Sequence, residues 1–244
     1  MPFEMELHGK KAVVFGGTSG IGLATVKRLV AAGASVVAVS RTPEDTARLE
    51  YESDLEGVRK VACDVTDEAA VEKVCEAEAP FDVLISTATG GKREMGPFLK
   101  MDLDGYKGSF AKLWGYAHVL RHGGPHVRAG GAVVLVSGAP ARGPKRGQAS
   151  LSTVGASVEQ LVRCVAPEFA ERDVRINVVS PGMIDTPLFS GPMREEKLET
   201  ATSATLIPRP GRADEVAHAV MFAVTNTYST GNTIDVDGGW LAGR

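Results

Sequence analysis

The stretch FGGTSGIG, residues 15–22, decides the fold. Its glycines have the spacing G-x-x-x-G-x-G and follow directly after the apolar run AVVF at 12–15. Glycines at a strand-to-helix turn let the chain turn tightly, and they let a pyrophosphate approach the backbone N–H groups at the helix N-terminus. Because turns are rich in glycine anyway, the spacing indicates a nucleotide site only through its place at the first such turn of an alternating chain. The residues expected to contact the nucleotide here are Gly16, Thr18, Ser19, Gly20, Ile21 and Gly22.

Short β-branched runs alternate with helical patterns along almost the whole chain. The runs are nearly all apolar, as expected for strands of a parallel sheet that is covered on both faces. The expected strands are 12–15, 35–40, 58–63, 81–86, 132–137, 174–180 and 232–237, and the expected helices lie near 20–32, 43–50, 67–77, 101–121, 149–171 and 213–224. This order predicts an α/β fold of the Rossmann type, a doubly wound parallel sheet of about seven strands with helices on both faces.

Nothing in the sequence divides the chain into parts. We find no linker, charge block or repeat, so we expect a single domain over residues 1–244. The longest irregular stretch is 187–210, which carries four prolines. A long irregular stretch in a compact domain is typical of a functional loop. We therefore expect a substrate lid at 187–210.

The composition is that of a soluble globular protein, with 43% hydrophobic and 23% charged residues. The net charge of −3 argues against a nucleic-acid-binding face, which needs a clustered basic excess. Three widely spaced cysteines, Cys63, Cys75 and Cys164, indicate reduced core residues rather than a disulfide or zinc site. The N-terminal segment MPFEMELHGK lacks a signal-peptide pattern, and no apolar run reaches the ~18–20 residues of a membrane span. We expect a cytoplasmic protein with no metal, nucleic-acid or membrane partner.

The residues after the second and third expected strands indicate which nucleotide is bound. Ser40, Arg41 and Thr42 stand where a carboxylate would bind the 2′-hydroxyl of NAD. A guanidinium suits the 2′-phosphate of NADP instead, although a solvated surface arginine is the alternative interpretation. Asp64, followed by Val65, could accept a hydrogen bond from the adenine amino group or could cap the next helix. The sequence predicts NADP(H) as the cofactor.

These motifs resemble those of the short-chain dehydrogenase/reductase family over about residues 8–240. Further matching segments are RINVVSPGMIDTPLF at 175–189, RPGRADEVAHAVMFAV at 209–224 and the terminal STGNTIDVDGG at 229–239. The resemblance implies that the nicotinamide end of the cofactor is held by Pro181, Gly182, Ile184 and Thr186. It also places the cofactor against Thr87 and Ala88, in the turn STATGG at 86–91.

The same resemblance exposes a departure in the residues that perform the family's chemistry. The family uses a tyrosine acid, a lysine four residues later, a serine that steadies the substrate oxygen and an asparagine on the fourth helix. No tyrosine occurs between Tyr116 and Tyr228, so no shift of alignment restores the acid. Ser137, one place before the serine position, is a tentative catalytic residue. The four family positions are occupied by Leu113, Gly138, Leu151 and Gly155.

The loss of the acid leaves two functions open. General acid catalysis is worth ~10²–10⁴-fold, so a plain ketone would be reduced slowly without it. The first hypothesis is an NADP(H)-dependent oxidoreductase with a non-standard active site, acting on a small-molecule carbonyl, enone or imine. The alternative is an NADP-binding protein without hydride transfer, either a nucleotide-responsive regulator or a non-redox enzyme such as a cyclase or lyase. The intact turn at 181–186 favours the first, and the missing lysine favours the second.

Two further expectations concern partners. Basic residues lie where this fold binds substrate, which indicates an anionic small molecule unless they form only a solvated rim. They are Lys92, Arg93, Arg142, Lys145 and Arg146. The apolar and small residues of 151–170 exceed what one buried helix stripe needs. Together with the family resemblance, this predicts a homotetramer or homodimer built on the fourth and fifth helices.

Overall fold

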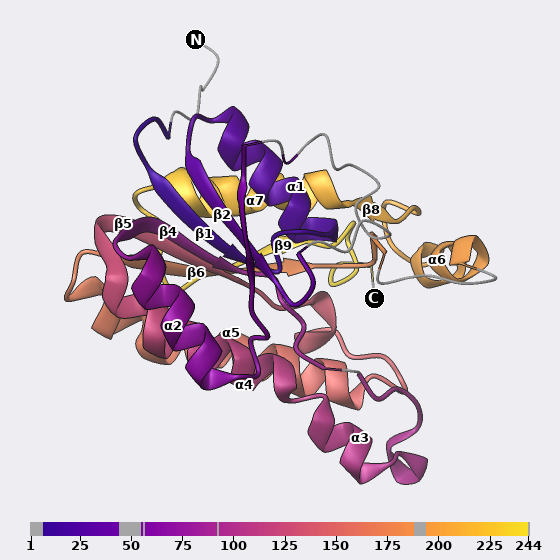
Figure 1. Cartoon of the computed structure of the whole chain (residues 1–244). Helices are drawn as coiled ribbons and strands as arrows, with labels where there is room; N and C mark the ends of the chain where they lie inside the picture. The colour runs from indigo at the N-terminus through magenta and orange to yellow at the C-terminus, as the bar shows by residue number, and fades with distance from the viewer. Residues whose placement is uncertain (1–6, 44–54, 56, 92, 188–193, 244) are drawn as a thin grey trace.

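A seven-stranded parallel sheet forms the centre of the computed structural model, with the strand order β3-β2-β1-β4-β5-β6-β9 (Figure 1). The structure describes residues 7–43, 55, 57–91, 93–187 and 194–243. Every neighbouring pair of strands is parallel. The strands are β1 (Lys11–Phe15), β2 (Ser35–Ser40), β3 (Arg59–Ala62), β4 (Phe81–Ser86), β5 (Val127–Val136), β6 (Arg175–Pro181) and β9 (Thr233–Val236). The predicted doubly wound sheet of about seven strands is confirmed.

Helices cover both faces of this sheet. Helices α1 (Gly20–Ala31) and α7 (Ala213–Thr225) lie on one face. Helices α2 (Glu68–Glu78), α4 (Ala111–His118) and α5 (Ala149–Ala170) lie on the other (Figure 1). The shorter elements are the helices α3 (Leu103–Gly108) and α6 (Arg194–Thr202), the strands β7 (Ile184–Asp185) and β8 (Gly211–Arg212), a π-helical turn at Val119–Gly123, and 3₁₀ turns at Phe98–Lys100, Gly124–His126 and Ala139–Ala141.

Successive side chains of the central strands enter two separate cores. In β1, Val13 and Phe15 pack with the α2, α4 and α5 side, whereas Ala12 and Val14 pack with the α1 and α7 side. All four are fully buried, which explains why the strand sequence does not alternate with polar residues. Burying a side chain of this size contributes roughly 1.5–3 kcal/mol, so the apolar runs stabilise both layers at once.

The region predicted as one helix at 101–121 is instead broken, and that prediction was wrong. Helix α3 ends at Gly108, α4 begins at Ala111, and a π-helical turn follows α4. Gly105 and Gly108 weaken α3, since glycine costs ~1 kcal/mol in a helix. Ser109 then donates its hydroxyl to the Gly105 carbonyl oxygen and accepts from the Glu94 amide, which holds the break in place. Only the first residue of the helix expected near 43–50 lies within the described residues.

The segment 187–210, predicted to be irregular, contains helix α6, so that part of the prediction was also wrong. Two acidic residues in the first turn of α6 suit the positive end of its dipole. The segment leaves the body of the protein at β7 and returns at β8, and these two strands pair with each other. Both ends of the segment are thereby held at one place.

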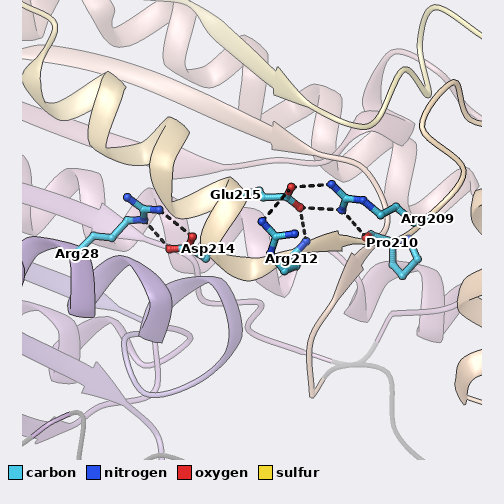
Figure 2. A network of polar contacts seen from close by, with 6 residues as sticks. All are labelled: Arg28, Arg209, Pro210, Arg212, Asp214 and Glu215. Atoms are coloured by element: carbon cyan, nitrogen blue, oxygen red, sulfur yellow. Dashed lines mark hydrogen bonds and ion pairs between the residues drawn. The ribbon is translucent and has the colours of Figure 1, made fainter. Parts of the chain in front are cut away.

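A polar network fixes the returning end of this segment to α7 (Figure 2). The Arg209 guanidinium donates to both oxygens of Glu215, and Glu215 also accepts from the Arg212 amide at 2.7 Å. The next residue, Asp214, accepts two hydrogen bonds from Arg28 of α1. The start of α7 therefore joins the returning segment to α1.

In the part of the chain that the structure describes, no helix has the length and apolar character needed to cross a membrane.

Candidate active site

A cavity of about 910 Å³ opens at the carboxyl ends of the strands. Its walls come from the segments that follow β1, β2, β3, β4, β5 and β6, and they are completed by α4, α5 and the C-terminal Trp240. The strand order reverses between β1 and β4, and this is the place where open α/β sheets bind ligands. Within the described residues no group of three or more His, Cys, Asp or Glu side chains could hold a metal ion.

Every residue that the sequence predicted to contact the cofactor lines this one cavity. The set comes from five separate segments of the chain. Its members are Gly16, Thr18, Ser19, Gly20, Ile21, Gly22, Ser40, Arg41, Thr42, Asp64, Val65, Thr87, Ala88, Pro181, Gly182, Ile184 and Thr186.

The glycine turn forms a cradle that side chains would fill. A Cβ atom on Gly22 would lie 2.0 Å from the Gly16 carbonyl oxygen, and a Cβ on Gly16 would lie 2.6 Å from Thr87 Oγ1. Gly16 also has a φ of +82°, which L side chains rarely adopt. Ser19, the N-cap of α1, makes no side-chain capping hydrogen bond, so amides of the first turn are left for an anion. This geometry fits a pyrophosphate.

The residues after β2 offer groups for a phosphorylated ribose. The Ser40 hydroxyl is buried and has no hydrogen-bond partner among the described residues. The neighbouring Arg41 is exposed at the rim of the cavity. A buried hydroxyl without a partner costs free energy unless a ligand completes its hydrogen bonds. An orphaned hydroxyl beside a guanidinium therefore fits the 2′-phosphate of NADP.

Asp64 does not cap a helix. Its Oδ1 accepts from the Thr66 amide at 2.9 Å and from the Thr66 hydroxyl at 2.7 Å, whereas the N-cap of α2 is Asp67. Burial disfavours the Asp64 carboxylate, but the two Thr66 hydrogen bonds and the charge of Arg41 hold its pKa below the ordinary value. The helix-cap interpretation of Asp64 was wrong, and its carboxylate lines the cavity in ionised form.

The opposite end of the cavity is where the resemblance placed the reacting groups. Gly138, Leu151 and Gly155 line it, whereas Leu113 packs against the core and is not a lining residue. A Cβ on Gly155 would lie 3.0 Å from the Ala141 Cβ, so α5 and the 3₁₀ turn at Ala139–Ala141 approach closely here. Neither Leu151 nor Gly155 carries a group that could transfer a proton.

Ser137 lines the cavity, but its hydroxyl is already engaged. It donates to Glu159 Oε1 at 2.9 Å, and Glu159 is a buried carboxylate on α5. Arg142 pairs with the second oxygen of Glu159 at 3.1 Å. The Ser137 hydroxyl proton is therefore engaged in a hydrogen bond to Glu159. Catalysis by Ser137 would require this hydrogen bond to break.

Sequence reasoning missed Lys112, the residue before the predicted position Leu113. Lys112 lines the cavity, is 8% exposed, and donates from Nζ to the Ser137 carbonyl oxygen at 3.1 Å. Burial and the nearby charge of Arg93 hold the pKa of this amine well below its ordinary value. The sequence did carry a signal for Lys112. It is a lysine in the segment SFAKLWG, one residue before the position aligned with the family's asparagine.

Two of the five basic residues expected at the substrate mouth interact with other parts of the protein. Arg142 pairs with Asp235 as well as Glu159, and Lys145 lies 3.6 Å from the centroid of the Trp240 ring. Arg146 is exposed and does not line the cavity, and Lys92 lies outside the described residues. Of the four members of that set that the structure describes, Arg93 alone is among the lining residues.

The chain matches one protein-family model over nearly its whole length. The family model described as enoyl-(acyl carrier protein) reductase matches residues 16–241. Among characterised proteins, L-xylulose reductase from Bos taurus is 32% identical over 247 residues, covering 98% of this chain and 99% of the relative.

Solved structures give the same result in three dimensions. A small-chain dehydrogenase in complex with NADPH has a TM-score of 0.81 at 28% identity, covering 95% of this chain and 98% of its own. A short chain oxidoreductase from Pseudomonas aeruginosa PAO1, described as containing an atypical catalytic center, has a TM-score of 0.84 at 29% identity, covering 96% of this chain and 98% of its own. The sequence and the fold of this chain are therefore similar to those of reductases along their full lengths.

Proposed function

The chain belongs to the short-chain dehydrogenase/reductase family, and from this premise we propose that it is an NADP(H)-dependent oxidoreductase with a non-standard active site. Its substrate in this proposal is a small-molecule carbonyl, enone or imine. The observation that carries the proposal is that one continuous cavity is lined by Arg41 as well as by Leu151 and Trp240. A protein that used only the adenosine half of the nucleotide would not need the turn at 181–186.

The cofactor assignment is supported by the fit of the cavity and by its relatives. The glycine cradle and the free amides of α1 suit the pyrophosphate, and Ser40 with Arg41 suits the 2′-phosphate. In this proposal Asp64 and Val65 hold the adenine and the turn at 181–186 holds the nicotinamide, and residues of both segments line the cavity. The NADPH complex among the similar structures supports the same choice.

The residues Leu151 and Gly155 favour hydride acceptors that need no acid from the protein. When bound, NADPH supplies a hydride, which turns an iminium into a neutral amine and an enone into an enolate that solvent can protonate. Leu151 and Gly155 contribute shape and exclude water here, and neither holds a proton. Orientation of the acceptor is then the main contribution of the protein, and proximity can supply ~7–11 kcal/mol of a barrier.

The segment 187–210 would act as the lid in this reaction. Its two ends are joined by the β7–β8 pair, and Ile184, Thr186 and Pro187 at its base line the cavity. A segment hinged at one place can cover a site and exclude water while the sheet stays unchanged.

One observation favours the second candidate, an NADP-binding protein without hydride transfer. Gly155 offers no ammonium to the nicotinamide ribose, which would then be held less firmly. Such a protein would be a nucleotide-responsive regulator or a non-redox enzyme such as a cyclase or lyase.

The two candidates are separated by one pair of measurements. NADPH is first titrated into the protein, and its binding is followed by calorimetry. Oxidation of the bound NADPH is then followed by absorbance with a panel of ketones, enones and imines. We expect binding, and oxidation by at least one imine or enone. Binding without oxidation by any member of the panel would favour the second candidate, and no binding would refute both.

A further inference from the structure

Two basic side chains line the reacting end of the cavity, with no carboxylate partner among the described residues. Lys112 comes from the first turn of α4 and Arg93 from the segment after β4. Lys112 is 8% exposed, and Arg93 is partly buried. Among the described residues, neither forms an ion pair, and the charged group that most affects the Lys112 amine is another cation, Arg93.

Two other cations with partly buried side chains, in contrast, have several hydrogen-bond or ion-pair partners. Arg142 is matched by Glu159 and Asp235. Arg175 donates to carbonyl oxygens at the end of α7, including Ala223 and Asn226. Lys112 has three donor positions, but the structure gives it one hydrogen bond, to the Ser137 carbonyl oxygen, and a Tyr116 ring whose centroid is 5.5 Å away.

Arg93 destabilises the charged form of Lys112 in the absence of an anion. Burial lowers the pKa of Lys112, and the charge of Arg93 lowers it further. Burial also lowers the pKa of Arg93. Taking a charge out of water costs free energy unless it is paired, so a ligand that brings a negative charge between these groups would recover that cost.

The amine also lies beside the positions where the family's reacting groups would stand. Lys112 Nζ contacts the carbonyl oxygen of Ser137, and a Cβ on Gly155 would lie 3.6 Å from the carbonyl oxygen of the next residue, Gly138. The exit of β5 is thus approached by Lys112 from α4 and by Gly155 from α5. An anion held by Lys112 would therefore sit next to the reacting carbon.

We propose that Arg93 and Lys112 form a subsite for a carboxylate of the substrate, close to the bond that is reduced. The inference rests on the proposed function and deepens it, because it makes the acceptor a short carboxylic acid. A guanidinium can donate two parallel hydrogen bonds to a carboxylate, and the ammonium adds a third donor. The pair also gives the protein a way to orient an acceptor without a tyrosine or serine hydroxyl.

Binding of a carboxylate tests the subsite independently of catalysis. The probe is pyruvate, titrated by calorimetry into the protein with and without saturating NADP⁺. The variants are Lys112→Met and Arg93→Leu, and the control is Lys107→Met, which removes an exposed charge from α3. We expect pyruvate to bind the wild type and Lys107→Met equally, and each of the other two variants at least tenfold more weakly.

Two further readouts keep the test decisive. Because Lys112 is buried without a carboxylate partner among the described residues, Lys112→Met should keep or raise the melting temperature of the ligand-free protein, which would show that weak binding is not unfolding. Arg93→Leu gives a second test at a less buried position. In turnover, 1-pyrroline-2-carboxylate should be reduced with a higher kcat/KM than 1-pyrroline in the wild type, and the preference should vanish in Lys112→Met.

Equal pyruvate binding by the wild type and Lys112→Met would overturn the subsite. The same holds for tighter binding of a phosphate monoester than of pyruvate, since the proposed ligand group is a carboxylate. If pyruvate binds through Arg93 and Lys112 but NADPH does not bind at all, the proposed function fails and the anion subsite stands. If NADPH binds and is oxidised but no carboxylate binds, the subsite fails and the proposed function stands.

Discussion

Arg41 is the residue on which the choice between NADP and NAD rests. It lies at the rim of the cavity beside the buried Ser40 hydroxyl, and the nearby Asp64 is turned to Thr66. We predict that NADPH binds at least tenfold more tightly than NADH, because the guanidinium pairs with the 2′-phosphate. Arg41→Asp should reverse this preference in calorimetric titrations. Arg121→Asp makes the same charge change at an exposed position of the π-helical turn after α4 and should leave the preference unchanged. Equal affinities of the wild type for both nucleotides would contradict the assignment.

Leu151 and Gly155 should make ordinary ketones poor substrates. We predict faster turnover of imines or enones than of ketones in steady-state assays. The double variant Leu151→Tyr, Gly155→Lys should raise ketone reduction by less than the ~10²–10⁴-fold of a complete acid, because groups that act together are not additive. Gly138 and Leu113 still lack the other two side chains, and the 3.0 Å approach of Ala141 crowds a lysine stem at 155. Brisk ketone reduction by the wild type would contradict this prediction.

At the scale of the elements, the glycine turn and the strands could be predicted because local chemistry dictates them. The cradle around Gly16 and Gly22 leaves no room for a Cβ, so the sequence there has no freedom. The break between α3 and α4 could not be predicted, because it depends on the contact of Ser109 with Glu94, 15 residues away. Lys112 was missed for a related reason. From the sequence, a lysine in an apolar helix is expected at the surface, and the fold is needed to show that Lys112 lines the cavity.

Glu215, in the first turn of α7, should make the free energy of unfolding of the protein depend on pH. Hydrogen bonds from the Arg209 side chain and the Arg212 amide lower the pKa of Glu215 to about 2 (Figure 2). The folded-state pKa is below the unfolded one, so this contribution is present above pH 4.5, the ordinary pKa, and is lost as pH falls toward about 2. Glu215→Gln should lower the free energy of unfolding by about 1 kcal/mol at neutral pH, the usual worth of a helix cap.

The measurement is urea unfolding of both proteins between pH 7 and pH 3. The difference between the wild type and Glu215→Gln should narrow as the pH falls below about 4.5. Glu168→Gln, at an exposed position of α5, is the matched control and should change little at any pH. A constant difference across the range would show that Glu215 acts through shape rather than through its charge.

At the scale of the whole molecule, the surface formed by α3, α4 and the turn before them carries more apolar area than a monomer needs. Trp114 on α4 is 64% exposed, Leu99 is 97% exposed, and Leu103 on α3 is 65% exposed. Helix α3 lies outside the two helical layers (Figure 1). On α5, Ala156 is exposed and Val165 is half-buried, whereas Val154, Val158 and Val162 are buried within the chain. Large exposed apolar side chains gathered on neighbouring elements are typical of an interaction site.

We predict that the protein is a homodimer or homotetramer joined through α4 and α5. Multi-angle light scattering at micromolar concentration should give a mass of two or four chains of 25.7 kDa. Trp114→Glu should weaken the association at least tenfold, because it places a charge in the centre of an apolar contact, where charged residues are depleted. Tyr228→Glu changes an aromatic residue that is 100% exposed elsewhere and should leave the mass unchanged. A wild-type mass of one chain would contradict the prediction, and an equal effect of both substitutions would mean that the interface lies elsewhere.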